Sequence, residues 1–457
     1  MSAEYVFYSF KGGFIIVEAN IHQENSSEFR KKHPPGLYLL FATEAWERFS
    51  YYGMRAILVL YLTATAINGG LGADKTTAIS LYGTFTSAVY LTPIIGGYLT
   101  DRFLPRRTAI TIGGVLMALG NFSIFLHQSM GALYLGLALL IIGNGFFKPN
   151  ISTIVGELYH INDPKRDGAF TIFYMGVNLG AFVAPLVVGL MDYRYGFLTA
   201  AIGMVVGQVL FNTLGNKYLG DIGKESAKKV QEHTQTVSKA PLTKQEVRRT
   251  IAIVILAVIT IAFWTAFEQA GSSLTLFTEE NIDRHLGDFI IPTEWFQSLN
   301  SLFIMLLAPI MSMLWFKLSQ TKNGDFKTPT KMGMGLITVG LGFFILIPAS
   351  VMVGDDSQVR VNMLFMVFTY FLHTLAELMI SPVGLSMVSR LSPLKLTSVL
   401  MGVWLASSAV ANKLASVLAT YTQSLGYFDI FGLIGIVTIV LGIIVLFVSK
   451  PIAKLME

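Results

Sequence analysis

The sequence has no cysteine among its 457 residues, and charged residues make up only 13% of it. The absence of cysteine excludes disulfide bonds and metal sites with thiolate ligands. A soluble domain of this length carries about twice this share of charge. Hydrophobic residues make up 53% of the chain, and they gather in apolar runs of about 18 residues or more. The sequence therefore predicts an all-α protein that crosses a membrane many times.

Several functional patterns are also missing. We find no metal-ligand cluster, no nucleophile beside a base and no phosphate-binding loop, so we expect neither an enzyme nor a bound metal or cofactor. The net charge of +5 does not indicate nucleic-acid binding, because Lys and Arg lie in loops between the apolar segments. Residues 1–35 are polar and lack the pattern of a signal peptide, so we interpret them as a cytoplasmic tail; an anchor on the membrane surface is the alternative.

Twelve apolar segments are long enough to span a bilayer. We place them at 36–66, 78–100, 107–127, 131–157, 168–191, 195–218, 247–279, 293–318, 331–352, 360–388, 395–424 and 428–449. A polar linker at 219–246, with no apolar run for further helices, separates two predicted six-helix bundles at 36–218 and 247–450. A short tail follows at 451–457. Lys and Arg concentrate in alternate loops, which predicts that both termini are cytoplasmic.

The two halves share short motifs in the same order. Residues 91–94 match 307–310, and residues 175–178 match 401–404. This similarity favours two parallel six-helix repeats that rock around a substrate site at the membrane midplane, as in major facilitator transporters.

The loop at residues 96–107 resembles the signature loop of the major facilitator superfamily. Gly96 and Gly97 permit close helix approach, and Asp101 can pair with a basic residue across a moving interface. Pro105 stands where that superfamily usually has glycine, so the turn must be made differently in this chain.

The first apolar segment carries an unusual set of polar residues. At about 100° per residue, six of them fall within an arc of about 140°. They are Glu44, Glu47, Arg48, Tyr51, Tyr52 and Arg55. Ionisable groups at membrane depth face a cavity or pair with one another, so this face is the first candidate for a substrate and ion pathway.

The other ionisable residues within the predicted spans are Lys148, Glu268, Glu377 and Lys413. The charges nearly balance, so most can be paired. A purely structural set of buried pairs is the alternative, but such pairs rarely add net stability. Lys413 has no partner in this scheme and could extend to the interface. His373, one helical turn before Glu377, could modulate that carboxylate.

Four motifs together resemble the proton-dependent oligopeptide transporter (POT) family. They are Glu44-x-x-Glu47-Arg48-Phe49-x-Tyr51-Tyr52-Gly53, Phe173-Tyr174-x-x-x-Asn178-x-Gly180, Phe263-Trp264-x-x-Phe267-Glu268-Gln269, and Glu377-x-x-x-Ser381-Pro382 followed by Trp404. The resemblance covers residues 36–448. It implies a major facilitator fold with twelve transmembrane helices in two six-helix bundles. It also implies import of di- and tripeptides by proton symport, through a functional monomer in the plasma (inner) membrane of a bacterium.

The resemblance also implies a substrate-binding set. This set is Arg48, Tyr51, Tyr52, Tyr90, Lys148, Asn178, Asn300, Glu377, Ser381 and Trp404, with Trp264 as a further pocket residue. Within it, Arg48, Lys148 and Tyr52 would hold the peptide carboxylate by charge-assisted hydrogen bonds. Glu377, helped by the two asparagines, would hold the terminal ammonium.

Proton coupling needs a carboxyl group whose proton affinity depends on its partners. Glu44 and Glu47 beside Arg48 meet this condition, and so does Glu268 if Arg55 reaches it. Since coupled carboxylates titrate as a group, the sequence does not choose between Glu44 and Glu47.

Two ion pairs are predicted to act as gates. Arg55–Glu268 would close the outer side, and Lys148–Glu377 would help to close the inner side. Protonation of Glu268 would release the outer pair. Two alternatives stay open, namely the same fold carrying another solute, such as nitrate, an amino acid or a drug-like molecule, and a non-transporting sensor.

Overall fold

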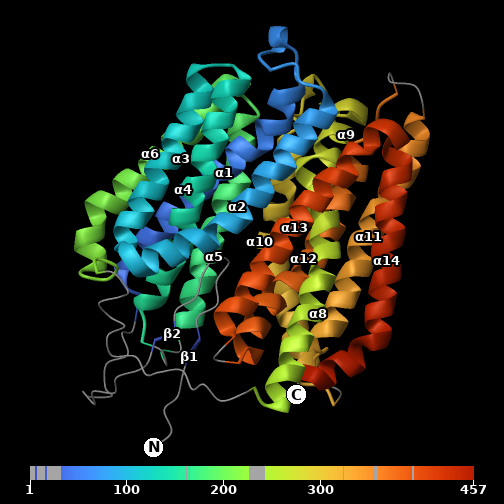
Figure 1. The fold of residues 1–457 in the computed structure, drawn as a ribbon. Coiled ribbons are helices and arrows are strands. Elements are labelled where there is room, and N and C mark those ends of the chain that lie inside the picture. Colours follow the sequence, from blue (N-terminus) through green and yellow to red (C-terminus); the bar gives the residue numbers. More distant parts are fainter. Residues whose placement is uncertain are drawn as a thin grey trace, which may run out of the picture. The chain divides into compact units, whose positions relative to one another are not determined.

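The computed structural model describes residues 6–7, 16–17, 32–160, 163, 165–225, 242–322, 324–354, 359–393 and 396–456. Within these residues, twelve α-helices have 21 residues or more (Figure 1). They are α1 (Pro35–Thr63), α2 (Lys75–Phe103), α3 (Arg106–Leu126), α4 (Met130–Glu157), α5 (Arg166–Val188), α6 (Tyr193–Leu219), α8 (Lys244–Phe267), α10 (Trp295–Ser319), α11 (Thr328–Val353), α12 (Leu364–Leu391), α13 (Thr397–Thr420) and α14 (Thr422–Met456).

All but one of these twelve helices have the length and composition of transmembrane segments. In the described part of the chain, eleven spans are apolar enough to cross a membrane, and α1 is not among them. It carries Glu44, Glu47, Arg48 and Arg55 along its length. The prediction of an all-α membrane protein with twelve transmembrane helices is therefore confirmed.

The chain forms two compact units. Unit 1 comprises Met1–Tyr51, Val89–Ala181 and Phe197–Pro241. In this unit, α3 and α4 meet at glycines: a Cβ atom added at Gly113 would lie only 2.6 Å from the carbonyl oxygen of Gly143. Small residues let membrane helices approach closely, where van der Waals contact replaces the missing hydrophobic driving force.

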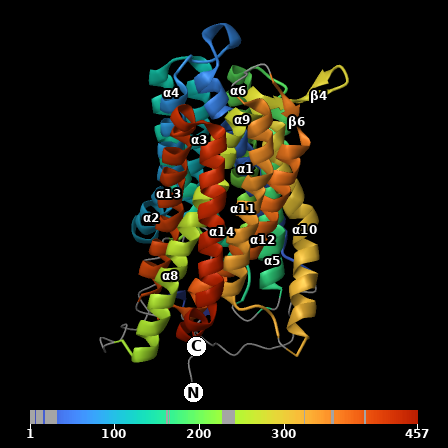
Figure 2. The same cartoon turned by 90° about the vertical axis from the view of Figure 1, so that its right-hand side faces the viewer.

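Unit 2 comprises Tyr52–Ala88, Phe182–Gly196 and Leu242–Glu457. Its helices α11 and α14 lie side by side in both views (Figures 1 and 2). They also meet at glycine, since a Cβ atom at Gly340 would lie 2.8 Å from the carbonyl oxygen of Gly435. Close contact between helices at glycine residues therefore occurs in both units.

The seventh predicted span contains an interruption. Helix α8 ends at Phe267, a 3₁₀ turn η2 occupies Glu268–Gly271, and a short helix α9 follows at Ser273–Asn281. The backbone leaves helical geometry at Ser272, where φ is −133° and ψ is −93°. The sequence did not predict this break, which begins at one of the predicted proton-coupling residues.

The described strands are all two residues long. β1 (Val6–Phe7) pairs with β2 (Ile16–Val17), β4 (His285–Leu286) with β5 (Phe289–Ile290), and β3 (Ile282–Asp283) with β6 (Val361–Asn362). Most of the predicted tail and the middle of the predicted linker lie outside the described residues. The predicted limits of tails, bundles and linker stay predictions.

Candidate functional site

Three charged side chains lie buried together on α1, within unit 1. The Nε of Arg48 lies 2.9 Å from Oε1 of Glu44, and the same nitrogen contacts Oε2 of Glu47. The two glutamates are only 4% and 0% exposed, and the arginine 4%. Residues three and four positions apart share a helix face, which is why the three groups meet. One guanidinium therefore serves two carboxylates.

A second cation lies close to this group. Lys148, on α4, interacts electrostatically with both Glu44 and Glu47. Its Nζ lies 5.0 Å from the ring centroid of Tyr90, in the range of a cation–π contact. Unit 1 thus brings two buried acids, the buried Arg48 and the half-buried Lys148 into one cluster, together with a tyrosine predicted for the substrate-binding set. The Tyr51 ring centroid lies 5.6 Å from the Arg48 Cζ.

Gly180 accounts for the closeness of α5 to the charged turn of α1. A Cβ atom at this position would lie 2.3 Å from the carbonyl oxygen of Ala45 and 2.8 Å from the Cβ of Arg48. Two residues earlier, the Nδ2 of Asn178 donates to the carbonyl oxygen of Tyr174 at 3.0 Å. The fifth-helix motif therefore provides the space in which Arg48 sits.

Gly180→Ala is expected to destabilise the protein by about 1–3 kcal/mol, because the added methyl group overpacks a backbone contact. Gly402→Ala, on α13, is the control, since a Cβ atom there would meet nothing within 4 Å. Helix propensity alone predicts that the control gains about 0.5–1 kcal/mol. Melting temperatures in detergent measure both variants. Equal melting temperatures for the two variants would contradict the close contact at position 180.

The predicted ion pair between Arg55 and Glu268 is present in unit 2. The Nη2 of Arg55 lies 2.5 Å from Oε2 of Glu268, and the two side chains are 13% and 5% exposed. The Arg55 Nε also donates to the hydroxyl of Tyr82 at 2.6 Å. A Cβ atom at Gly271 would lie only 1.7 Å from that hydroxyl, so glycine at this position makes room for the tyrosine.

Glu377 has polar neighbours on two helices of unit 2. The Nδ2 of Asn300, on α10, donates to Oε2 of Glu377 at 2.9 Å and to the hydroxyl of Thr374 at 3.1 Å. Glu377 is 6% exposed. Asn300, predicted as a helper of this carboxylate, therefore contacts it directly. His373 packs instead against aromatic rings, with its ring centroid 4.8 Å from that of Phe343.

The remaining predicted residues of unit 2 have defined surroundings. The Tyr52 ring centroid lies 5.8 Å from the Arg55 Cζ. Trp404 is buried and Ser381 is half-buried. Lys413, unexplained from the sequence, donates to the hydroxyl of Thr84 on α2 at 2.9 Å.

The loop at residues 96–107 packs as its glycines predict. A Cβ atom at Gly96 would lie 2.1 Å from the carbonyl oxygen of Gly145 on α4. Asp101 pairs with Arg106 of the same loop at 3.5 Å. Pro105 makes the turn with extended backbone, φ −62° and ψ 141°, directly before α3. Proline suits this position for two reasons. Its ring fixes φ at a negative value like the one observed, and a residue before the first turn of a helix needs no backbone N–H for the helix.

A further carboxylate lies just outside the spans, immediately before α10. Glu294 is 7% exposed. Burial raises the pKa of Glu294 to about 7; the negative charge of Glu279 adds to this, while a backbone hydrogen bond and Arg284 oppose it. The group therefore changes charge near neutral pH while the protein is folded.

Glu294→Gln is expected to stabilise the protein at pH 8 and to change little at pH 5. The folded-state pKa lies above that of the unfolded chain, so the wild type loses stability as the pH rises from about 4.5 to about 7. The upper limit of this loss is about 3 kcal/mol. Melting temperatures at the two pH values measure it. Asp283→Asn is the control: hydrogen bonds from His285 lower the pKa of Asp283, so its removal brings no gain at pH 8.

The fold and the buried charges define the class of this protein. It is a multi-pass membrane protein of the major facilitator fold with charged clusters buried among its helices. The sequence model of the POT family matches residues 107–226 and 215–434. An uncharacterized transporter of Bacillus subtilis (strain 168), YclF, is 37% identical over 476 residues, covering 93% of this chain and 95% of its own. A di-/tripeptide transporter of Lactococcus lactis subsp. lactis (strain IL1403) is 33% identical over 484 residues, covering 93% and 96%.

A solved structure agrees with these relatives. The crystal structure of a peptide transporter POT in complex with sulfate is 33% identical and has a TM-score of 0.86, covering 94% of this chain and 97% of its own. The chain belongs to the POT family, as its motifs predicted.

Two contacts of the site escaped the sequence analysis. The hydroxyl of Tyr82 accepts a hydrogen bond from Arg55. The hydroxyl of Thr374 accepts one from Asn300. Uncharged hydroxyl side chains are common in membrane helices, and nothing in their sequence context distinguishes these two. The charged residues could be predicted because charge at membrane depth is costly, and the uncharged members of the predicted set came from the resemblance to the POT family.

Proposed function

We propose that this protein is a proton-coupled symporter that imports di- and tripeptides by alternating access. The observation that carries the proposal is the buried cluster of unit 1, in which Arg48 lies against two carboxylates with Lys148 close by. A membrane protein retains such a costly cluster where charge is needed for function. Membership of a family with named di-/tripeptide transporters supports the peptide as substrate.

Each end of a zwitterionic peptide then has a matching group. Arg48 and Lys148, with Tyr52, bind the peptide carboxylate by charge-assisted hydrogen bonds, and Glu377 binds the terminal ammonium. Asn300 supports this role, because its amide donates to Oε2 of Glu377 and holds the carboxylate in place. Side chains of the peptide would meet Tyr51, Tyr90, Ser381, Trp404 and the other residues of the predicted substrate-binding set.

Proton movement uses the buried carboxylates. A buried carboxyl group holds its proton or releases it according to whether a cation is beside it. Glu44 and Glu47 both contact Arg48, and Glu268 contacts Arg55, so protonation of a carboxyl group would release its cation. We assign the Arg55–Glu268 pair to the outer gate. The inner gate between Lys148 and Glu377 stays a prediction.

The test is uptake of labelled dialanine into liposomes that contain the purified protein. With an inward proton gradient, dialanine should accumulate above its external concentration, and a protonophore should abolish the accumulation. Nitrate and free alanine, offered in parallel, distinguish the same fold carrying another solute. Absence of any gradient-dependent accumulation of dialanine would refute the proposal.

The setting of the transporter is part of the proposal. We place it in the plasma membrane of a bacterium, with both termini in the cytoplasm and the monomer as functional unit. The bacterial relatives and the distribution of Lys and Arg support this setting. Protease accessibility of a C-terminal tag in inside-out and right-side-out vesicles tests the orientation.

A further inference from the structure

An apolar cavity of about 440 Å³ lies among α8, α11, α13 and α14 of unit 2. Aliphatic side chains such as Ala262 and Leu441 form its wall, and its only polar lining residues are Thr265 and Thr438. Both hydroxyls are already used on backbone carbonyl oxygens, at 3.4 Å and 2.8 Å. The protons of both hydroxyls are therefore already engaged, and the otherwise apolar wall suits a hydrocarbon chain.

The rim of the cavity faces outward from unit 2. Val258 of α8 is 60% exposed, Leu414 of α13 is 44% exposed and Leu433 of α14 is 47% exposed. These helices are among those apolar enough to cross a membrane, so their exposed side chains meet lipid. A lipid chain can enter the cavity from the side.

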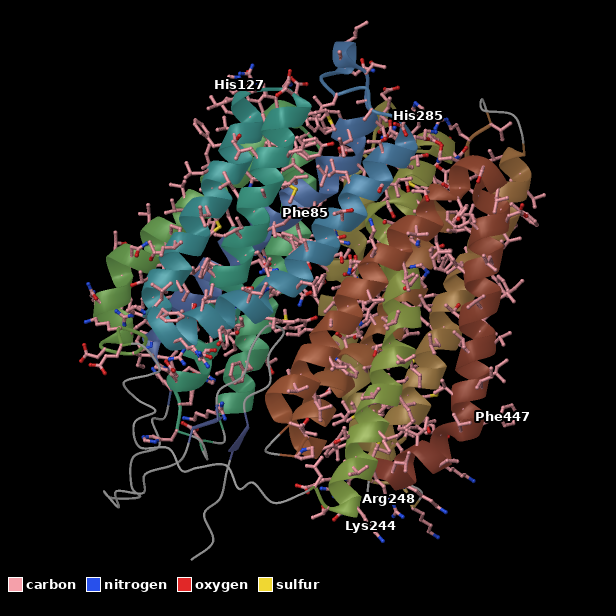
Figure 3. All side chains as sticks on the ribbon, viewed as in Figure 1. Phe85, His127, Lys244, Arg248, His285 and Phe447 are labelled. Carbon is pink, nitrogen blue, oxygen red and sulfur yellow. The ribbon has the colours of Figure 1, made fainter. Side chains whose placement is uncertain are left out.

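Basic residues lie where α8 begins and α14 ends. α8 begins and α14 ends next to each other in both views (Figures 1 and 2), and Figure 3 shows Lys244 and Arg248 at this end. Lys450 and Lys454, on α14, are exposed like the two residues of α8. One acidic residue at this end, Glu246, caps α8 and accepts hydrogen bonds from Thr243.

An apolar stripe connects the basic end with the cavity. Val247, Ile251, Val254 and Val258 follow one face of α8 and are each more than 40% exposed. The ten helical steps from Arg248 to Val258 span about 15 Å along the helix. This length equals the hydrocarbon depth of one leaflet, about half of a 30 Å core. A chain whose headgroup lies at the basic end therefore reaches the cavity.

We propose that this surface is a binding site for an anionic phospholipid of the phosphatidylglycerol type. Its phosphate lies among Lys244, Arg248, Lys450 and Lys454, and one acyl chain follows the stripe into the cavity. Four cations within reach of one headgroup favour a net negative lipid over a zwitterionic one. The site is independent of the proposed peptide pathway.

The test compares dioleoyl phosphatidylglycerol with dioleoyl phosphatidylcholine, titrated onto the purified full-length protein in detergent. Native mass spectrometry counts the bound lipids, and melting temperature reports stabilisation. We expect tighter binding of the phosphatidylglycerol. Arg248→Gln/Lys450→Gln should weaken it by about thirtyfold, because each lost charge costs about fivefold in affinity, and should leave phosphatidylcholine unchanged. Ala262→Phe, which fills the cavity, should weaken both lipids.

Lys317→Gln/Lys322→Gln is the matched control, because it removes two cations at the end of α10 and in the loop after it. An equal loss in this control would show diffuse attraction and overturn the proposal. Equal binding of the two lipids by the wild type would overturn it as well. So would full displacement by glycerol phosphate, which has the headgroup but no chain. Ala262→Phe keeps all charges, so it tests the acyl chain even if the charge variants fold poorly.

Discussion

Glu268→Gln is expected to abolish the accumulation of dialanine against its concentration gradient, while exchange of peptide across the liposome membrane continues. An amide of the same shape still accepts a hydrogen bond from Arg55, so the pair keeps its geometry. It cannot take up a proton, so proton binding no longer releases the pair. Uptake driven by a proton gradient and counterflow of labelled against unlabelled dialanine measure the two activities separately.

The matched control is Glu280→Gln on α9. Glu280 also forms an ion pair, with Lys75 at 2.6 Å, but these side chains are 30% and 40% exposed. A pair in contact with water contributes about 0–1 kcal/mol, so both transport activities should persist. Gradient-driven accumulation by Glu268→Gln would show that the coupling proton binds elsewhere. Loss of exchange together with accumulation would show that position 268 has a structural role instead.

The sequence allowed the charged part of this site to be predicted because charge is rare in its apolar segments. With so few ionisable residues available, Arg55 had few acids to pair with, and Glu268 is its partner in the structure. The same reasoning did not find Tyr82, because this side chain is uncharged and does not enter a count of charges. Nor did it find a partner for Lys413, because that partner, Thr84, is neutral.

Backbone departures were harder to predict than helices. Long apolar runs predicted the twelve long helices, since a buried backbone in lipid must satisfy its hydrogen bonds internally. The break at Glu268–Gly271 has no proline to mark it. Within the break, Gly271 leaves room for the hydroxyl of Tyr82, a contact between residues almost two hundred positions apart in the sequence. Contacts of this kind appear only when the helices are placed together.

Arg48→Met is expected to destabilise the protein by about 3–5 kcal/mol and to abolish dialanine binding. The substitution removes the guanidinium but keeps an unbranched side chain, and it leaves Glu44 and Glu47 buried with Lys148 as their remaining cation among the described residues. An unpaired buried carboxylate carries the full cost of desolvation. Melting temperature in detergent and calorimetric titration with dialanine measure the two effects.

Glu47→Gln/Arg48→Met separates binding from stability. This double variant leaves one acid, Glu44, and one base, Lys148, so the buried cluster is again balanced. It should recover about 2 kcal/mol or more of the lost stability, because a neutral amide at position 47 has no charge to desolvate. Dialanine binding should stay absent, since the guanidinium that holds the peptide carboxylate is still missing. Recovery of binding with stability would show that Arg48 serves only to neutralise the glutamates. A double variant as unstable as Arg48→Met would show that the shape of the arginine, and not its charge, supports unit 1.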